Sequence, residues 1–591
     1  MASLFDGKGK TDSSEPEESG KGPNVKEEKY MQAERGKGQT PEKRIRENIR
    51  FVPADAAGML LFFLAAAMAV CSLSLCTSTD IWYDELFTMG FIGEPVERLL
   101  ELAAKDVHPP LYYLIVKAFV DTVHLFASSI DPVVIAKTVS VLPYLCLLAY
   151  AAWLVRKRDG WLCAGLFAFC LLSMPQMSNY TTEIRMYGWA LFFLTAAFLH
   201  VREILITRRA VHWAAFFVYG ICAAYCHYFA AVSVVFLYLV LAVLLLWEKA
   251  KNERQEKADS HPAGKTSWLK TLKPCFWCAG LSVLSYLPWL PAALDQVSAV
   301  REDYWILPLT LSCFGGCVKF VLKPSTGWQV PDHVIAVLLF VCLFVYLIRA
   351  FFCRKKAREE WKKAVYASCG IWVLAGTALF GIAVSFLMRP VFVYRYMLPA
   401  LGGFWFCFAY FAAEGWSVPG GCQQGRRQGR RMLFSPVSRK RLWKLLPLLL
   451  LLLVGLVDYR SFLQGELVKK EQMERTLQAF EGMEEDSIVL FNFDQVQAVA
   501  SYYLNRETWL YGDEPEMLIK EMFPDVQAGG DALWVRSLLE EGRTVWFVGS
   551  NLAREAVLAE WAEYGMIPEE TVDSLLLERY WFNLYRMSLE A

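Results

Sequence analysis

The sequence predicts a polytopic α-helical membrane protein of about eleven transmembrane helices, followed by a C-terminal extracytoplasmic α/β domain. The composition is 55% hydrophobic and 15% aromatic, and these values are extreme for a soluble enzyme. Apolar runs long enough to cross a bilayer recur through most of the chain. From residue 460 onward these runs stop, and short strand-like and helix-like segments alternate instead.

Residues 1–50 are expected to form a disordered cytoplasmic tail. Gly, Lys, Glu, Ser and Pro dominate this segment and large apolar side chains are almost absent, so it cannot bury enough surface to fold. Four basic residues precede the first apolar run, as the positive-inside tendency predicts, namely Lys43, Arg44, Arg46 and Arg50. We interpret that first run as a retained signal anchor, because no small-residue cleavage site ends it.

A transmembrane domain is expected over residues 51–459. The expected spans lie near 56–76, 133–155, 160–175, 187–206, 211–227, 229–247, 274–294, 332–352, 364–388, 397–413 and 442–458. Threading them from a cytoplasmic N-terminus places all the basic clusters inside, namely 156–158, 208–209, 249–273, 354–363 and 426–444. The odd number of spans puts the C-terminal domain outside. We therefore expect an integral protein of the plasma membrane.

The sixteen cysteines do not indicate a disulfide framework or a zinc site. Most of them lie inside apolar runs, where cysteine is expected to be a small packing residue. Cys275 and Cys278 form a single CxxC pair without a second pair, so the zinc interpretation is weak. No cysteine follows Arg460.

The C-terminal domain, residues 460–591, is expected to be a small α/β domain with a largely parallel sheet. It contains 25 Asp and Glu against 11 Lys and Arg. Strand-like and helix-like segments alternate in the order 487–493 (strand), 494–504 (helix), 508–511 (strand), 531–541 (helix), 544–548 (strand) and 554–564 (helix), before two final strands at 574–577 and 580–586. No glycine-rich loop follows the first strand, so we expect an accessory role rather than a nucleotide site.

Two polar clusters in the first expected outer loop, residues 77–132, are the strongest functional signal. Trp82-Tyr83-Asp84-Glu85 follows the first span, and Asp106-Val107-His108-Pro109-Pro110 follows some two dozen residues later. Connectors between helices are usually short and chemically plain. This loop instead carries two adjacent carboxylates and, further along, an aspartate and a histidine followed by two prolines. We interpret this composition as a functional site.

Other ionisable groups are expected on the same face of the membrane. They are Glu183, Arg185, His227, Arg389 and Arg395. Each has an ordinary structural explanation, such as a solvated loop pair, a turn residue or a side chain that reaches the lipid headgroups. Their joint occurrence on one side favours a site instead. Carboxylates suit a general base or a divalent cation, and arginines suit a phosphate. Together they suit group transfer from a phosphate-linked donor.

The motifs resemble those of the multi-span glycosyltransferases of the C-type (GT-C) fold, in the branch of protein O-mannosyltransferases, aminoarabinose transferases and Rgt-like enzymes. The resemblance covers about residues 56–415. It is carried by Trp-Tyr-Asp-Glu (82–85), Asp-Val-His-Pro-Pro-Leu-Tyr-Tyr (106–113), Glu-Ile-Arg-Met-Tyr (183–187), His-Tyr-Phe (227–229) and Val-Tyr-Arg-Tyr-Met-Leu-Pro (393–399). The resemblance implies a sugar donor on a polyprenyl phosphate and an acidic catalytic residue in the first outer loop.

Carried over residue by residue, the resemblance implies a role for each group. Asp84 would take the acceptor's proton, Glu85 would order the site, and a single displacement with inversion would need only that one base. The remaining groups would bind the donor phosphate or the acceptor, namely Asp106, His108, Glu183, Arg185, Tyr187, Arg389 and Arg395. A divalent metal held by Asp106, His108 and His227 stays an open alternative, and no other cofactor is expected. The aminoarabinose-transferase branch typically has lysine where this chain has His108.

The expected partners are a polyprenyl-phosphate sugar, the lipid bilayer and a glycan, lipid or protein acceptor, with no nucleic acid. Three other functions stay open at this point. A ligase or polymerase of surface polysaccharide would use the same donors. A transporter would place its charges in mid-span, not at span ends. A sensor would leave the cluster around Asp84 and His108 unexplained.

Overall fold

The structure is a computed structural model, and it describes residues 53–258, 267–302, 306, 308–352, 358–414, 439–504, 506–551, 553–577 and 579–590. Both the helical bundle and the sheet domain lie in one compact unit, Ala54–Ala591. The expected tail, residues 1–50, lies outside the described residues.

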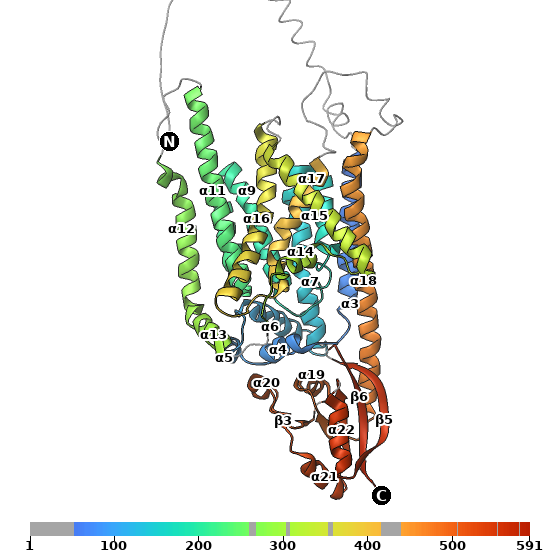
Figure 1. Ribbon diagram of the computed structural model, residues 1–591. Coiled ribbons are helices and arrows are strands. Elements are labelled where there is room, and N and C mark those ends of the chain that lie inside the picture. Colours follow the sequence, from blue (N-terminus) through green and yellow to red (C-terminus); the bar gives the residue numbers. More distant parts are fainter. Residues whose placement is uncertain are drawn as a thin grey trace, which may run out of the picture. The chain divides into compact units, whose positions relative to one another are not determined.

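Within the described residues, nine helices are long and apolar enough to cross a membrane (Figure 1). They cover Ala54–Leu75, Pro132–Ser173, Tyr187–Thr207, Tyr228–Glu253, Trp268–Ser298, Gln329–Ile348, Lys362–Leu387, Tyr394–Glu414 and Leu445–Glu481. The protein is therefore a polytopic helical membrane protein. The elements that build the bundle are α3 (Pro53–Leu75), α7 (Pro132–Tyr150), η1 (Ala151–Val155), α8 (Arg156–Ser173), α9 (Tyr187–Thr207), α10 (Ala210–Cys226), α11 (Tyr228–Ala258), α12 (Trp268–Tyr286), η2 (Leu287–Trp289), α13 (Leu290–Glu302), α14 (Cys313–Leu322), α15 (Gln329–Phe352), α16 (Arg358–Leu387), η3 (Tyr394–Ala400), α17 (Leu401–Glu414) and α18 (Arg439–Glu481).

The difference between nine long helices and eleven expected spans has two local causes. Pro132–Ser173 contains two of the expected spans, and the helix breaks between them at Gly160, whose φ of +82° lies in the region that favours glycine. The expected span at 211–227 is the helix α10, which has only 17 residues. Each expected apolar run is thus helical in the structure.

Small residues allow two pairs of helices to touch along their backbones. A Cβ atom on Gly165 of α8 would collide with the backbone of Gly58 in α3, and one on Gly370 of α16 would collide with Gly403 in α17. Close approach through small residues is a common means of helix association in membranes, where lipid offers no hydrophobic driving force between helices.

The first loop is helical and joins the bundle to the sheet domain. Between α3 and α7 it forms α4 (Tyr83–Gly93), α5 (Val96–Lys105) and α6 (Leu111–His124), which Figure 1 shows between the spanning helices and the strands. The Tyr503 hydroxyl of the sheet domain donates to the Thr79 carbonyl and accepts from Ile81 N, both at 2.9 Å. The Tyr83 hydroxyl donates to Glu516 Oε2 at 2.5 Å. The sheet domain therefore holds the loop that carries Asp84.

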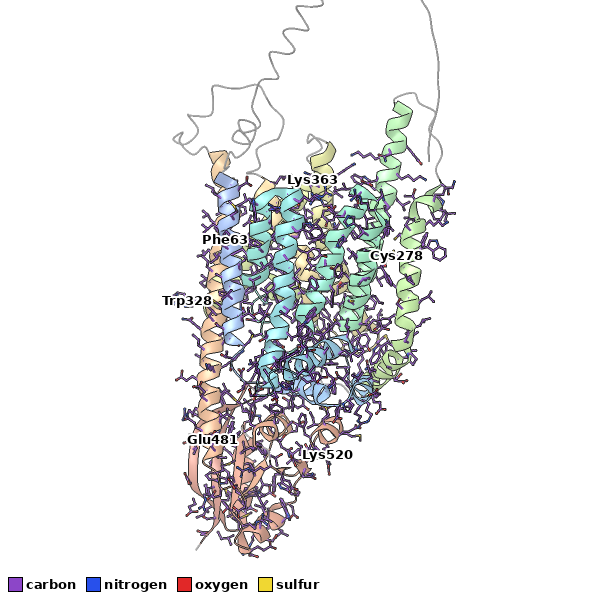
Figure 2. The ribbon with its side chains drawn as sticks, turned by 180° about the vertical axis from the view of Figure 1, so that it is seen from behind. Phe63, Cys278, Trp328, Lys363, Glu481 and Lys520 are labelled. Carbon is purple, nitrogen blue, oxygen red and sulfur yellow. The ribbon has the colours of Figure 1, made fainter. Side chains whose placement is uncertain are left out.

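Helix α18 runs without a break through position 460, where the C-terminal domain was expected to begin. It has 43 residues, and Figure 2 shows Glu481 near its domain end and Lys363 at the opposite end of the bundle. The apolar run stops near residue 458, but helix-forming Leu, Gln, Glu, Lys and Met residues continue. The change in composition therefore marks the end of the apolar surface and not the end of the helix.

The C-terminal domain contains a six-stranded sheet in the order β3-β2-β1-β4-β6-β5. Strands β1 to β4 are parallel, and β6 and β5 are antiparallel additions. The elements are β1 (Ile488–Phe491), α19 (Asp494–Leu504), β2 (Thr508–Leu510), α20 (Met517–Met522), β3 (Val526–Ala528), α21 (Ala532–Glu540), β4 (Val545–Ser550), α22 (Ala553–Glu563), β5 (Met566–Leu577) and β6 (Tyr580–Leu589). The expected mixed α/β domain is confirmed, while α20 and β3 were not predicted.

Candidate active site

Helix α4 presents its two adjacent carboxylates to different surroundings. Glu85 turns inward and is 4% exposed, and its two oxygens accept from Trp82 N at 3.1 Å and Ile184 N at 2.6 Å. Burial raises the pKa of Glu85 to about 7. Glu85 thus ties the start of α4 to the segment that precedes α9, whereas Asp84, about 100° further round the helix, faces elsewhere.

Asp84 meets two arginines that come from distant parts of the chain. Its Oδ2 atom lies 3.0 Å from Nη1 of Arg395, and its side chain is 21% exposed. Nη1 of Arg185 donates to the backbone carbonyl of Asp84 at 2.6 Å. Arg185 lies just before α9 and Arg395 near the start of η3. Arg395 therefore pairs with the carboxylate of Asp84, and Arg185 with its backbone carbonyl.

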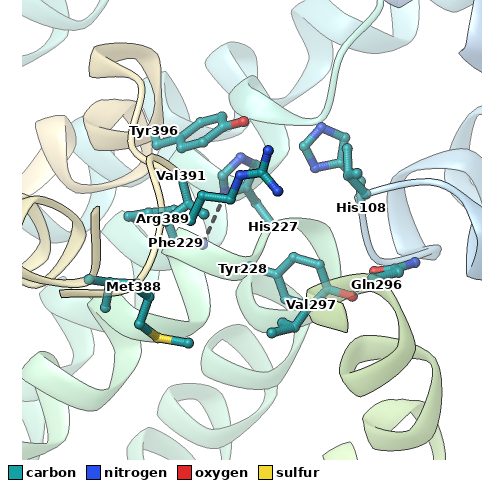
Figure 3. A pocket seen from close by; sticks show the side chains of 12 residues that line it. His108, His227, Tyr228, Phe229, Gln296, Val297, Met388, Arg389, Val391 and Tyr396 are labelled. Carbon is teal, nitrogen blue, oxygen red and sulfur yellow. Dashed lines mark hydrogen bonds between the residues drawn. The ribbon is translucent and has the colours of Figure 1, made fainter. Parts of the chain in front are cut away.

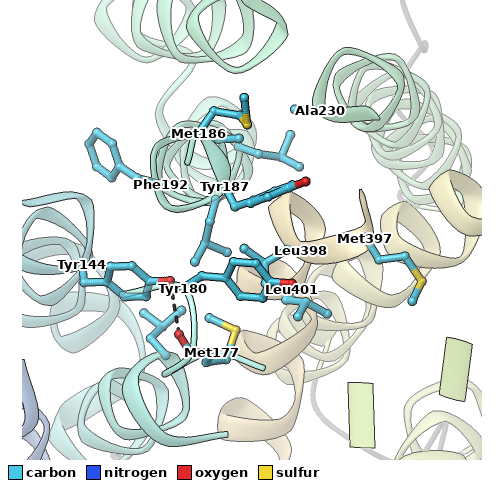
Figure 4. Packing of buried hydrophobic residues seen from close by; sticks show 14 of the residues in the cluster. Tyr144, Met177, Tyr180, Met186, Tyr187, Phe192, Ala230, Met397, Leu398 and Leu401 are labelled. Atoms are coloured by element: carbon cyan, nitrogen blue, oxygen red, sulfur yellow. Dashed lines mark hydrogen bonds between the residues drawn. The ribbon is translucent and has the colours of Figure 1, made fainter. Parts of the chain in front are cut away.

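The segment before α9 is fixed by packed tyrosines, which Figure 4 shows from close by. The Tyr144 hydroxyl donates to the Met177 carbonyl at 3.2 Å. The rings of Tyr180 and Tyr187 lie 5.2 Å apart, edge to face, a favourable geometry for aromatic pairs. This packing holds Arg185 in place beside Asp84.

His108 and His227 face each other with ring centroids 5.3 Å apart. Phe229 N donates to Nδ1 of His227 at 3.0 Å, so the ring proton of neutral His227 is on Nε2. Burial lowers the pKa of His108 well below its ordinary value, and the positive charge of Arg185 adds to this effect. Burial and Arg185 likewise lower the pKa of His227, to about 3. Both rings are therefore neutral near pH 7.

Several buried polar atoms around Asp84 have no hydrogen-bond partner among the described residues. They are Nε of Arg185, Nε of Arg395, the hydroxyl of Tyr187, Nδ1 of His108 and Nε2 of His227. Ring contacts connect them: the Arg395 guanidinium lies 6.0 Å from the Tyr187 ring centre, and the Tyr187 ring lies 5.4 Å from that of His227. Buried polar atoms normally have partners. The group is thus suited to receive a polar ligand.

Asp106 lies at the end of α5 and accepts a hydrogen bond from the Tyr113 hydroxyl at 2.9 Å. Burial raises its pKa, while Arg185 opposes the rise. In the part of the chain that the structure describes, no three His, Cys, Asp or Glu side chains come together so that they could hold a metal ion. Asp106, His108 and His227 therefore do not form a donor set that fits a divalent cation, and we derive no step through a metal.

An apolar pocket of about 210 Å³ opens beside the two histidines (Figure 3). It is lined by Val107, His108, His227, Tyr228, Phe229, Gln296, Val297, Val384, Met388, Arg389, Val391 and Tyr396. Gln296 fixes one wall, because its Nε2 donates to the carbonyls of Ala103 and Ala104 at 2.8 and 3.1 Å. In Figure 3 the Arg389 side chain extends into the space that His108 and His227 border.

A second, polar cavity of about 460 Å³ lies on the Trp82 side. Its lining is made by Asp80, Trp82, Glu85, Lys137, Gln176, Asn179, Tyr180, Thr182, Glu183, Ser325, Asp458, Ser461, Phe462, Gly465, Glu466, Lys469 and Arg579. The Arg395 guanidinium lies 5.7 Å from the centre of the Trp82 ring and 6.0 Å from that of Tyr187, which contacts His227 of the apolar pocket. Arg395 and its partner Asp84 thus connect the two cavities.

The structure brings most of the expected site residues into one place. Those that meet are Asp84, Asp106, His108, Arg185, Tyr187, His227 and Arg395. Three others line the two neighbouring cavities: Glu85 and Glu183 line the polar cavity, and Arg389 lines the apolar pocket beside His108 and His227. Trp82 and Arg579 were not among the expected site residues. Trp82 lies in the first motif, whereas no local pattern gives a signal for Arg579.

The helical bundle, the helical first loop and the appended sheet domain define a C-type glycosyltransferase fold. The crystal structure of ArnT from Cupriavidus metallidurans in the apo state matches with a TM-score of 0.51 and 11% identity, over 89% of this chain and 97% of that chain. The structure of the same protein bound to undecaprenyl phosphate gives a TM-score of 0.47 and 14% identity over the same shares. No protein-family model and no curated protein sequence matches. The chain thus has the fold of ArnT, and the expected C-type fold is confirmed.

Proposed function

We propose that the protein is a glycosyltransferase that moves a sugar from a polyprenyl-phosphate donor to an acceptor hydroxyl. The observation that carries the proposal is the group of unpartnered buried polar atoms beside Asp84. Nε of Arg185, Nε of Arg395, the Tyr187 hydroxyl and Nε2 of His227 are all potential donors. Converging donors with two permanent positive charges suit an anion such as a phosphate.

The donor would occupy the apolar pocket. Most of its lining is aliphatic or aromatic, which suits the first isoprene units of a lipid tail, and Arg389 adds a further cation. The pocket borders His108 and His227. The positive charges of Arg185 and Arg395 lie close enough to both rings to lower the pKa of each. A phosphate at the head of the tail would therefore reach both guanidinium groups.

The reaction would be a single displacement. The Asp84 carboxylate takes the proton of the acceptor hydroxyl, and the acceptor oxygen attacks the anomeric carbon as the bond from that carbon to the phosphate oxygen breaks. The products are the glycosylated acceptor with inverted configuration and a free polyprenyl phosphate, and the proton leaves Asp84 for solvent. Arg185 and Arg395 stabilise the charge that develops on the departing phosphate. General base catalysis of this kind typically contributes roughly 10²–10⁴-fold.

The acceptor would enter from the polar cavity. Trp82 and Tyr180 offer aromatic faces there, and Gln176, Asn179 and Thr182 offer hydrogen-bonding groups. Aromatic faces with polar neighbours suit a carbohydrate or another polyhydroxylated acceptor. Trp82 is two residues before Asp84, so an acceptor held at this wall lies close to the base.

The test of the proposed function uses membranes that contain the protein and a lipid-linked sugar labelled in its polyprenyl part. We expect release of free polyprenyl phosphate in proportion to the amount of protein, and much less with equal amounts of the Asp84→Asn variant. Unchanged donor after incubation with folded wild-type protein would contradict the proposal.

We also propose that the end of the bundle carrying Asp84 faces outside, as the positive charges at the other end suggest. In a background without native cysteines, the exposed position of Glu555→Cys should react with an impermeant thiol reagent on intact cells, and the exposed Lys157→Cys should not. The reverse pattern would contradict this orientation.

A further inference from the structure

A turn of the C-terminal domain reaches the polar cavity. Arg579 follows β5 in the hairpin that joins β5 to β6, and its guanidinium lies 3.6 Å from the centre of the Trp82 ring. Such a contact is a cation–π interaction, which leaves the edge of the guanidinium free to donate hydrogen bonds. Arg579 also lines the polar cavity with Glu183. A residue of the sheet domain thus lies over the tryptophan that precedes Asp84 by two positions.

The hairpin that carries Arg579 is held from both sides. The Thr476 hydroxyl of α18 donates to the Leu576 carbonyl at 2.9 Å, and the ring of Tyr580 packs 4.8 Å from that of Phe493. Leu577 and Tyr580 are paired in the ladder on either side of the turn. The position of Arg579 is therefore set by the fold of the domain.

Most charged groups of the polar cavity already have partners. Lys137 pairs with Asp80 at 2.7 Å, and Lys469 pairs with Glu466. Asp458 accepts from Ser325 N at 2.8 Å. The charges of these side chains are therefore already balanced or hydrogen-bonded within the protein, and they are poorly placed to bind a charged ligand.

Arg579 and Glu183 are the exceptions. Within the described residues, the Arg579 guanidinium makes no hydrogen bond and no ion pair, and the cation–π contact with Trp82 leaves its N–H groups available. Burial raises the pKa of Glu183 to about 8, so this carboxyl is largely neutral near pH 7. The cavity therefore offers one uncompensated cation.

We propose that Arg579 is an acceptor-binding residue supplied by the C-terminal domain, and that it binds a phosphate or carboxylate group of the acceptor. The guanidinium fork matches either group with two parallel hydrogen bonds. This inference rests on the proposed transfer function and adds to it that the acceptor is anionic. It also makes the C-terminal domain part of the acceptor site.

The experiment offers three small acceptors to the full-length protein together with a lipid-linked sugar labelled in its sugar. The acceptors are a hexose 6-phosphate, a hexuronate and the uncharged hexose. We expect wild-type protein to prefer at least one charged acceptor over the hexose by roughly tenfold or more, as one charged hydrogen-bonded pair would give. The two charged acceptors distinguish phosphate from carboxylate.

Arg579→Gln should remove this preference through a higher KM for the charged acceptor, and Arg579→Lys should restore it in part. The matched control is Arg586→Gln on the same hairpin, whose guanidinium pairs with Glu484 and Glu569 and does not line the cavity. That control should keep the preference. An equal preference in Arg579→Gln, or none in wild type, would overturn the inference. A wild-type protein that releases no polyprenyl phosphate would instead overturn the proposed function.

Discussion

Nη1 of Arg395 lies 3.0 Å from Oδ2 of Asp84. The residue that would hold the donor phosphate and the residue that would take the acceptor's proton therefore form one ion pair before any ligand is bound. An arriving phosphate would compete with Asp84 for the same guanidinium. We expect donor binding to loosen the pair and to leave the Asp84 carboxylate ready for the acceptor proton.

The first prediction concerns the phosphate contacts. Arg395→Gln should weaken the binding of polyprenyl phosphate by roughly tenfold to a hundredfold, because a hydrogen bond from a charged group contributes about 1.5–3 kcal/mol. Arg185→Gln should have a similar effect. Titration of purified protein with polyprenyl phosphate measures it. The control is Arg208→Gln, an exposed arginine that pairs with Glu248 at the other end of the bundle. Wild-type affinity in both site variants would show that the phosphate lies elsewhere.

The second prediction separates Glu85 from Asp84. Glu85→Ala leaves two backbone N–H groups without an acceptor, and each such group costs about 1–3 kcal/mol when buried. The variant should unfold at a lower temperature than wild type, and Glu85→Gln should lie between them because its amide keeps one acceptor oxygen. Thermal unfolding in detergent measures the order. A Glu85→Ala protein with wild-type stability and no turnover would instead place Glu85 in the chemistry.

The third prediction is a pH dependence of stability. Burial raises the pKa of Glu183 from an ordinary 4.5 to about 8, so folding favours its protonated form. The stability it contributes is complete below pH 4.5 and is lost as the pH rises through about 8. Glu183→Gln removes this loss.

The melting temperature of Glu183→Gln should therefore exceed that of wild type by roughly 2–5 °C more at pH 9 than at pH 5. Glu101→Gln is the control, since Glu101 is exposed and pairs with Arg98 on the surface of α5. If the melting temperatures of wild type and Glu183→Gln differed by the same amount at pH 5 and at pH 9, this would contradict an elevated pKa of Glu183.

The motifs predicted which residues meet, but their individual surroundings required the fold. Asp84, His108, Arg185 and Arg395 could be assigned to one site because ionisable groups at span ends are costly and gathered on one face. The dipeptide Asp84-Glu85 does not reveal that Glu85 is buried while Asp84 pairs with Arg395. That difference depends on which side of α4 faces the protein interior. Arg579 could not be found because its contact with Trp82 is created by the packing of a distant hairpin.

The fourth prediction tests whether the C-terminal domain supports the loop. Tyr503→Phe removes the hydroxyl that bonds to Thr79 and Ile81, so the start of α4 should become more mobile. We expect turnover to fall several-fold, and amide exchange in residues 79–86 to become faster. Tyr502→Phe is the matched control, because its neighbouring ring packs on Tyr503 without these bonds. Equal turnover and exchange in the two variants would mean that the contact does not order the loop.

The most direct test of the account is the turnover of Asp84→Asn at saturating donor. Asparagine keeps the shape of the side chain but cannot take a proton, so turnover should fall by roughly 10²–10⁴-fold. The affinity for polyprenyl phosphate should stay the same or rise, because Arg185 and Arg395 remain and the carboxylate that competes for Arg395 is gone. A folded Asp84→Asn protein with near-normal turnover would contradict the account, and Asp106 would become the next candidate for the base.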